Sequence, residues 1–148
     1  MFMPPSGSQV EVTQELRTQA GSARLFIQNG EVRPRNKITV QNPYCQFFSN
    51  RSREEMRESL VIRPQVFTIT RSYQRRDFSW AYGVQVADAS SNADLSTIME
   101  LGSDIQPDIV RLTCLRWGSR RFDGFLTINE MKTTLGGLVN LNIISQPG

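Results

Sequence analysis

The sequence predicts a mostly β domain, either an antiparallel sandwich or a small barrel, with one short helix near the C-terminus. Three observations support this expectation. Apolar side chains alternate with polar ones in several windows, turn-forming residues separate those windows, and a helix-capping pattern stands close to the end of the chain. The length of 148 residues fits a single domain.

The first eight residues are expected to lie outside this domain, which then spans 9–148. Pro4, Pro5 and Gly7 make segment 1–8 a poor candidate for regular structure, so we expect it to be disordered or to be an addition to the natural chain. The segment has neither the basic start nor the apolar stretch of a signal peptide. The protein is therefore expected either to be cytosolic or to be a mature form from which a signal was removed.

Alternation with a period of two predicts eight strands, because successive side chains of a strand point to opposite faces. Turn signals such as Asn42-Pro43 and Asp123-Gly124 separate them, at a spacing typical of a sandwich or barrel rather than of βαβ units. The expected strands cover 22–28, 37–41, 44–49, 60–62, 66–73, 95–101, 109–117 and 138–144.

Strict alternation also predicts which side chains share a face of the sheet. In three windows the expected faces are Phe67 and Ile69 with Arg71 and Tyr73; Leu95 with Thr97, Met99 and Leu101; and Ile109 with Arg111, Thr113, Leu115 and Trp117.

Two segments could be helical. The charged segment 50–59 could form a short helix or a solvated loop. Segment 127–136 is the better candidate, because Thr127 followed three residues later by Glu130 is a capping-box pattern and Gly136 suits a helix end.

The two cysteines, Cys45 and Cys114, each lie in an expected strand with apolar neighbours. On facing strands they could close a disulfide across the core, and the alternative is a pair of buried free thiols that behave as small apolar residues. A zinc site and a catalytic thiol are not expected, because neither the ligand spacing nor a neighbouring base is present.

The chain contains no histidine, and this excludes several kinds of chemistry. The usual general base near neutral pH is missing, as are Ser-His-Asp and Cys-His nucleophiles and the commonest zinc ligand. Carboxylate chemistry at Glu100, Asp104 and Asp108 stays open, although a solvated turn between two strands is the favoured interpretation of these residues. We therefore expect a protein that is not an enzyme, with no catalytic residue, metal site or cofactor.

The segment 71–82 is the best candidate for a binding surface. Arginines can hold phosphates and aromatic rings can stack on bases, which is the combination that single-stranded nucleic acids require. The net charge of +3 permits an anionic partner without requiring one. Alternating aromatics also fill β cores, so nucleic acid is the alternative here and not the first expectation. The candidate residues are Arg71, Tyr73, Arg75, Arg76 and Trp80.

Four stretches together resemble a family of small proteobacterial envelope proteins of uncharacterised function, made with an export or lipoprotein signal. The stretches are residues 23–30, 43–45 and 62–69, and 97–104 running into 111–114. The resemblance implies a periplasmic or envelope location, and an oxidising compartment would favour the disulfide between Cys45 and Cys114. It implies no catalytic residue. The chain departs from a lipoprotein because no cysteine near its start could be acylated.

The leading functional expectation is thus a non-enzymatic periplasmic or envelope-associated domain with a structural or protein-interaction role, and a cytoplasmic location is the alternative. Its partner would be another protein or an envelope surface, with membrane contact only through an anchor absent from this chain. Exposed strand edges would allow either a monomer or an edge-paired dimer.

Overall fold

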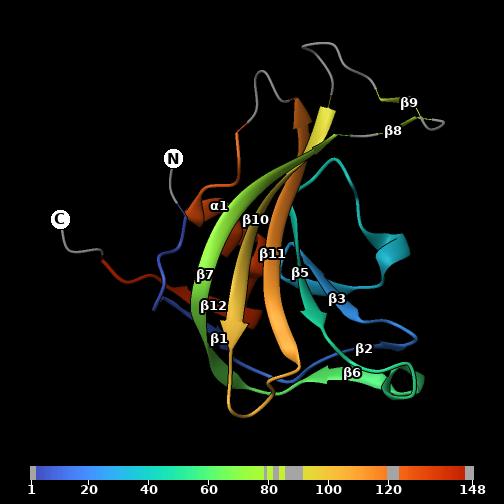
Figure 1. Cartoon of the computed structure of the whole chain (residues 1–148), viewed down its shortest axis with the longest axis vertical. Coiled ribbons are helices and arrows are strands. Elements are labelled where there is room, and N and C mark those ends of the chain that lie inside the picture. Colours follow the sequence, from blue (N-terminus) through green and yellow to red (C-terminus); the bar gives the residue numbers. More distant parts are fainter. Residues whose placement is uncertain (1–2, 79, 82–83, 86–91, 120–123, 146–148) are drawn as a thin grey trace.

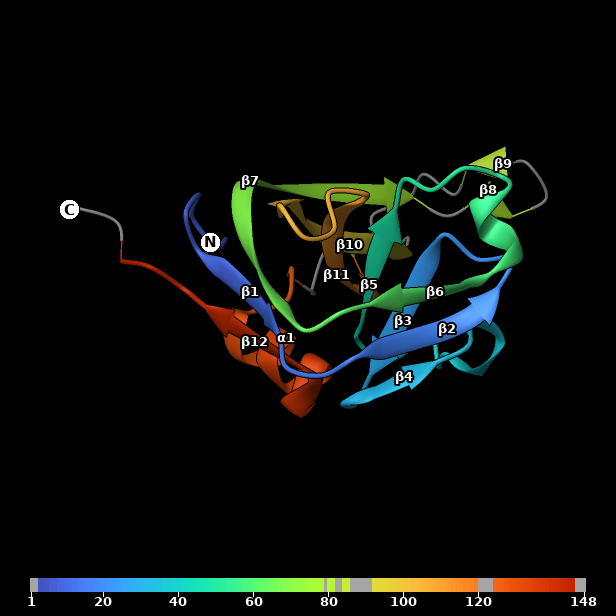
Figure 2. The same cartoon turned by 90° about the horizontal axis from the view of Figure 1, so that it is seen from below.

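The structure, a computed structural model, describes residues 3–78, 80–81, 84–85, 92–119 and 124–145. An eight-stranded antiparallel sheet bends into a half-barrel around one core (Figures 1 and 2). The sheet order is β12-β1-β7-β10-β11-β5-β3-β4. Its strands are β1 (Gln9–Val12), β3 (Arg24–Gln28), β4 (Glu31–Arg33), β5 (Tyr44–Ser49), β7 (Gln65–Phe78), β10 (Asn92–Gly102), β11 (Ile109–Ser119) and β12 (Val139–Asn142). The expected fold class is confirmed.

Two further strands fold over the open side of the half-barrel. The strands β2 (Leu16–Ala20) and β6 (Ser59–Ile62) pair with each other, and we call this ribbon the flap. It continues the pairing of β1 with β7, because Val12 lies opposite Gln65 and Leu16 lies opposite Ile62. Pro64, which cannot donate to a strand ladder, stands at the bend between β6 and β7. A separate short ribbon joins β8 (Trp80–Ala81) to β9 (Val84–Gln85).

The helix α1 (Ile128–Leu135) packs against β5, β3 and β12. It begins with the expected capping box, in which the Thr127 side chain accepts from the Glu130 N–H and the Glu130 carboxylate accepts from the Thr127 N–H. Single turns of 3₁₀-helix occur at η1 (Arg35–Lys37), η2 (Glu55–Arg57) and η3 (Gly136–Leu138). Among the described residues, no helix is long and apolar enough to cross a membrane.

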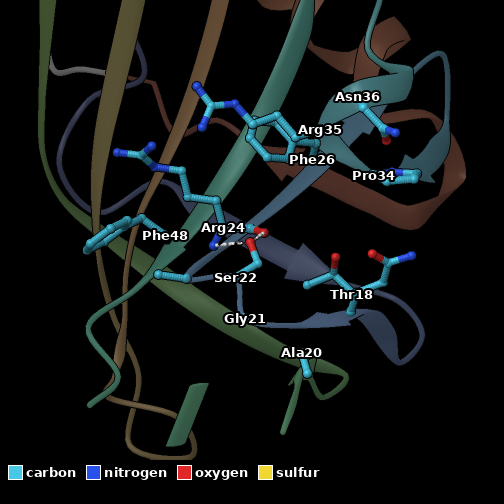
Figure 3. A pocket seen from close by; sticks show the side chains of 12 residues that line it. Thr18, Ala20, Gly21, Ser22, Arg24, Phe26, Pro34, Arg35, Asn36 and Phe48 are labelled. Carbon is cyan, nitrogen blue, oxygen red and sulfur yellow. Dashed lines mark hydrogen bonds between the residues drawn. The ribbon is translucent and has the colours of Figure 1, made fainter. Parts of the chain in front are cut away.

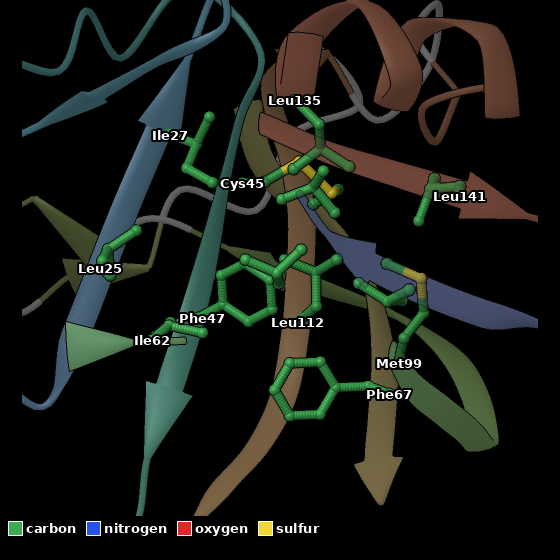
Figure 4. Close-up of a cluster of buried hydrophobic side chains, with 14 of the residues drawn as sticks. Leu25, Ile27, Cys45, Phe47, Ile62, Phe67, Met99, Leu112, Leu135 and Leu141 are labelled. Atoms are coloured by element: carbon green, nitrogen blue, oxygen red, sulfur yellow. A yellow bond between two sulfur atoms is a disulfide. The ribbon is translucent and has the colours of Figure 1, made fainter. Parts of the chain in front are cut away.

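The core lies between the inner face of the half-barrel, the flap and α1 (Figure 4). Each fully buried large apolar side chain contributes about 1.5–3 kcal/mol relative to an exposed one. The largest buried side chains include Phe47, Phe67, Leu16, Leu25, Ile27, Ile62, Met99 and Leu112.

Cys45 and Cys114 form a disulfide, and both residues are fully buried. They lie directly opposite each other on the neighbouring strands β5 and β11, with their Cα atoms 4.0 Å apart. The predicted bond is therefore present, but it joins two strands of one sheet and does not span the core. Figure 4 shows it beneath Leu135 of α1.

Two β-bulges overturn two of the expected faces. On β7, Glu100 faces Arg71 and Leu101 faces Ile69, so Thr70 is an extra residue and alternation shifts by one. Phe67 and Ile69 therefore face the core, whereas Arg71 and Tyr73 lie on the opposite, outer face.

A second bulge at Val110 has the same effect on β11. Ile109 lies opposite Ser49 and is fully buried with Leu112 and Cys114, whereas Arg111 lies opposite Phe48 on the outer face. The third expectation is confirmed, because Leu95, Thr97 and Met99 are all fully buried on the inner face and Leu101 packs against the core.

Two segments differ from the expectation, and a third follows one of its two alternatives. Residues 37–41 form no strand, since η1 ends at Lys37 and a turn follows. Segment 50–59 takes the loop alternative, with η2 as its single helical turn and Ser59 already in the flap. Segment 3–8 is packed on the sheet and not disordered, because Pro4, Pro5 and Ser8 are buried and the Gly7 N–H donates to the Ile69 carbonyl at 2.8 Å.

Candidate functional site

The five residues expected to form a binding surface do not lie on one face. Arg71, Tyr73 and Arg75 project from the outer face of β7, two residues apart. Arg76 lies on the inner face beyond the bulge, with its guanidinium 4.9 Å from the ring of Phe125. Trp80 belongs to β8, but its side chain and residues 79 and 82 lie outside the described part of the chain.

On the outer face, the arginines of β7 have partners of their own. The guanidinium of Arg71 lies 4.8 Å from the ring centre of Tyr73, and Arg75 pairs with Asp77 at 3.2 Å. Both side chains of that ion pair are about half exposed, so it contributes little to stability. These three residues form an arginine–tyrosine strip on the outer face, and its role in binding stays a prediction.

The outer face carries a second arginine–aromatic group that the sequence did not reveal. Phe48 of β5 lies opposite both Arg111 of β11 and Arg24 of β3. The two guanidinium carbons are 4.2 Å and 5.6 Å from its ring centre, respectively. These three residues are far apart in the chain, and only the strand register brings them together.

Next to Arg24 lies a groove with a volume of about 640 Å³ (Figure 3). We call it the seam, because it separates β2 of the flap from β3 and from the end of β4. It is lined by residues 18–24, Phe26, residues 34–36 and Phe48. A narrower hollow of about 230 Å³ shares Arg24, Phe26 and Arg35 with it and extends to Tyr44.

Local sequence explains why the seam stays open. Pro34 follows the last residue of β4 and directs the chain into η1, so β4 pairs with β3 only from Phe26 onward. On the other side, Gly21 has a φ of 88° and ends β2 in a turn that most residues disfavour. The two strand pairs therefore diverge, and side chains of η1 and β3 line the space between them.

The electrostatics of the seam are positive. Figure 3 shows the Arg24 and Arg35 side chains extending to the same side, next to Phe26 and Phe48. Burial raises the pKa of the neighbouring Tyr44 and the charge of Asp94 adds to this rise, whereas Arg35 and Arg24 act to lower it. Among the described residues that line the seam, none is acidic.

The three carboxylates that kept an enzymatic route open do not assemble into a metal site. Asp108 accepts a hydrogen bond from the Ser49 hydroxyl at 2.9 Å, Glu100 lies within β10, and Asp104 is exposed in the turn after it. The described residues contain no group of three acids or cysteines placed to hold a metal ion.

The chemistry of the seam suits binding. Arginines, phenylalanines, amides and hydroxyls can hold a charged or flat ligand, but none of them exchanges protons readily near neutral pH. The chain matches no known family model, no curated protein and no solved structure.

Proposed function

We propose that this chain is an extracytoplasmic, non-enzymatic domain that acts by binding a partner protein. The observation that carries the proposal is the Cys45–Cys114 disulfide, because disulfides persist in oxidising compartments and are rare in the cytosol. Among oxidising compartments, a periplasmic or envelope-associated position is the one that the resemblance of the sequence favours.

The seam supports a binding role within this proposal. Its volume lies in the range of ligand-binding clefts, and its lining combines two guanidinium groups with aromatic and uncharged polar side chains. These groups can fix and orient a partner, and the sequence contains no histidine that could act as a general base beside them.

The test is the compartment and thiol state of the protein in its natural host. Cells expressing the natural gene are fractionated, and each fraction is denatured in an alkylating reagent so that buried thiols react. We expect the protein in an extracytoplasmic fraction, with Cys45 and Cys114 alkylated only after reduction. A cytoplasmic protein with both thiols alkylated without reduction would contradict the proposal.

A second candidate is a module that binds single-stranded nucleic acid, and the outer face of β7 favours it. Arg71, Tyr73 and Arg75 alternate there, with a guanidinium near a ring that could also stack on a base. A labelled oligonucleotide should then bind at low salt, with an affinity that falls steeply as salt rises.

Matched variants test this second candidate. Replacing Arg71 and Arg75 by glutamine should weaken binding, whereas Arg57→Gln, at an exposed arginine of η2, should not. Absence of any oligonucleotide shift at low salt would eliminate it.

A further inference from the structure

The seam is bordered by strand edges that have no partner strand. Within the described residues β2 pairs with β6 alone, so its opposite edge faces the groove. Across the groove, β4 reaches only Phe26 of β3, so Arg24 has no partner strand on that side. The Ser22 hydroxyl accepts from the Arg24 N–H and donates to the Arg24 carbonyl, so the open edge is that of β2. Alternate residues of such edges direct N–H and C=O groups away from their own sheet, where another strand can accept them.

The length and shape of the seam match an extended chain. The five residues of β2 correspond to roughly 17 Å of strand. Beyond the main groove, a hollow of about 300 Å³ continues between the flap and β4, past Pro34 to Val32 and Arg17. The opening therefore follows β2 from Arg17 to Ala20 and is not a pit at one point.

The charge of the seam selects among extended chains. Arg24 and Arg35 have no ion pair within the described structure, and no described acidic residue lines the groove or its continuation. Arg17, at the far end, pairs with Glu15 at 3.4 Å, but both side chains are more than half exposed and can exchange partners.

We propose that the seam binds an extended acidic segment of a partner protein, which adds as a strand beside β2 and places carboxylates on Arg24 and Arg35. The proposal rests on the proposed function, since it names the site and the chemistry of the protein partner. Strand addition supplies affinity through main-chain hydrogen bonds and specificity through alternate side chains. Because alternate residues of a strand share a face, the segment carries acids at every second position.

A second copy of this chain is a poorer occupant. Two copies that pair through β2 around a two-fold axis bring the same surface together. Arg24 and Arg35 of one copy would then meet those of the other, and this like-charge contact opposes pairing.

The experiment is an NMR titration of the oxidised full chain with a terminally blocked seven-residue peptide that alternates glutamate and valine. We expect the largest amide shifts at Thr18–Ala20 and at Arg24. Arg24→Gln and Arg35→Gln should each weaken binding about threefold to fivefold, the upper part of the range for an exposed ion pair. The control variant Arg57→Gln, on the exposed η2 turn, should bind as the unmodified chain does.

Matched peptides separate charge from main-chain pairing. A peptide alternating lysine and valine should not bind. Two versions of the acidic peptide, N-methylated at all valines or at all glutamates, each lose the N–H groups of one edge, and at least one of them should fail to bind.

Several results would overturn the proposal: equal binding of the lysine peptide, retained affinity of both methylated peptides, shifts confined to the outer face of β7, or a dimer that forms through β2 without peptide. The outcomes also separate the two proposals. If the protein is oxidised and extracytoplasmic but does not bind the peptide, only the assignment of the seam is contradicted. A reduced cytoplasmic protein that binds it removes the proposed location and keeps the seam.

Discussion

Where α1 packs against β5, β3 and β12, buried apolar side chains and the disulfide lie beneath the helix, whereas a groove lies open beside β2. Leu135 and Met131 of α1 are fully buried over the disulfide side. The Nη2 atom of Arg116 donates to both carboxylate oxygens of Glu130 at 2.7 Å, and this contact links β11 to the helix.

The flap has far fewer such attachments. It reaches the main sheet through the bends at both of its ends and through buried residues such as Leu60 and Ile62, but β2 has one partner strand among the described residues. Regions with few packed neighbours open first in native proteins, and binding surfaces are drawn from that end of the stability range. The difference predicts that the flap, which borders the proposed binding seam, opens more readily than the side covered by α1.

Removal of the disulfide should have the largest effect on this comparison. The double variant Cys45→Ala, Cys114→Ala should lose about 2–5 kcal/mol of unfolding free energy, because the bond closes a loop between residues 69 apart in sequence. Urea unfolding of the oxidised chain and of the variant measures the loss. A change below about 1 kcal/mol would mean that packing alone holds this side.

Leucine truncations on the two sides should differ next. Leu135 of α1 is fully buried and Leu60 of the flap is 3% exposed, so truncation to alanine removes the same buried atoms from each side. Leu→Ala costs about 2–5 kcal/mol, with the value set by how far the surroundings collapse into the cavity. We expect Leu135→Ala near the upper end and Leu60→Ala near the lower end in chemical denaturation. Equal costs would show that the flap is as rigid as the helix side.

The link between α1 and β11 should be sensitive to pH. Burial acts to raise the pKa of Glu130, but the hydrogen bond from the Thr127 N–H and the charge of Arg116 outweigh burial and hold this pKa below its ordinary 4.5. A carboxyl whose pKa is lower in the folded state stabilises the fold above its unfolded pKa, and this contribution is lost as pH falls through the folded value.

Glu130→Gln can keep the capping hydrogen bond but removes the negative charge beside Arg116 and the helix N-terminus. It should therefore cost about 1 kcal/mol at neutral pH and progressively less below pH 4.5. Urea unfolding across this pH range measures how the unfolding free energies of the variant and the unmodified chain approach each other. The exposed Glu54→Gln serves as the control, with an expected change within about 0.5 kcal/mol. A difference in unfolding free energy that stays constant with pH would show that the charge of Glu130 beside Arg116 does not contribute to stability.

The sequence predicted the parts of this fold that depend on local pattern. The strand at 44–49 and the capped helix after Thr127 are present as expected, since alternation and capping act within a few residues. The disulfide was also anticipated, but its placement within one sheet depends on which strands are neighbours, and no local pattern records that.

The candidate site depended on longer-range features. An extra residue at Thr70 moves Arg71 and Tyr73 to the outer face, and strict alternation cannot reveal such a bulge. The sequence did not predict the seam, because β2 and β4 are short strands without clear alternation. Arg24 and Arg35 line the same groove only once η1 has folded back. A cue was present in Pro34, which marked the end of a strand without indicating what would face it.

The smallest expected effect concerns Asp94, whose negative charge opposes that of Arg24 and Arg35 at the seam. Burial raises the pKa of Asp94, and Asp77, directly opposite it on β7, raises it further. An acid with a raised folded pKa costs stability once pH rises through its unfolded value. Asp94→Asn should therefore stabilise the domain at neutral pH by about 0.2–1 kcal/mol and have no effect in acid.

The same substitution should lower the pKa of Tyr44, because Asp94 contributes to the rise of this pKa while Arg35 and Arg24 oppose it. Urea unfolding at neutral and acid pH and an ultraviolet titration of tyrosine measure the two effects. A gain in stability with an unmoved Tyr44 would show that the charge of Asp94 does not reach the seam, and the positive potential there would then depend on the arginines alone.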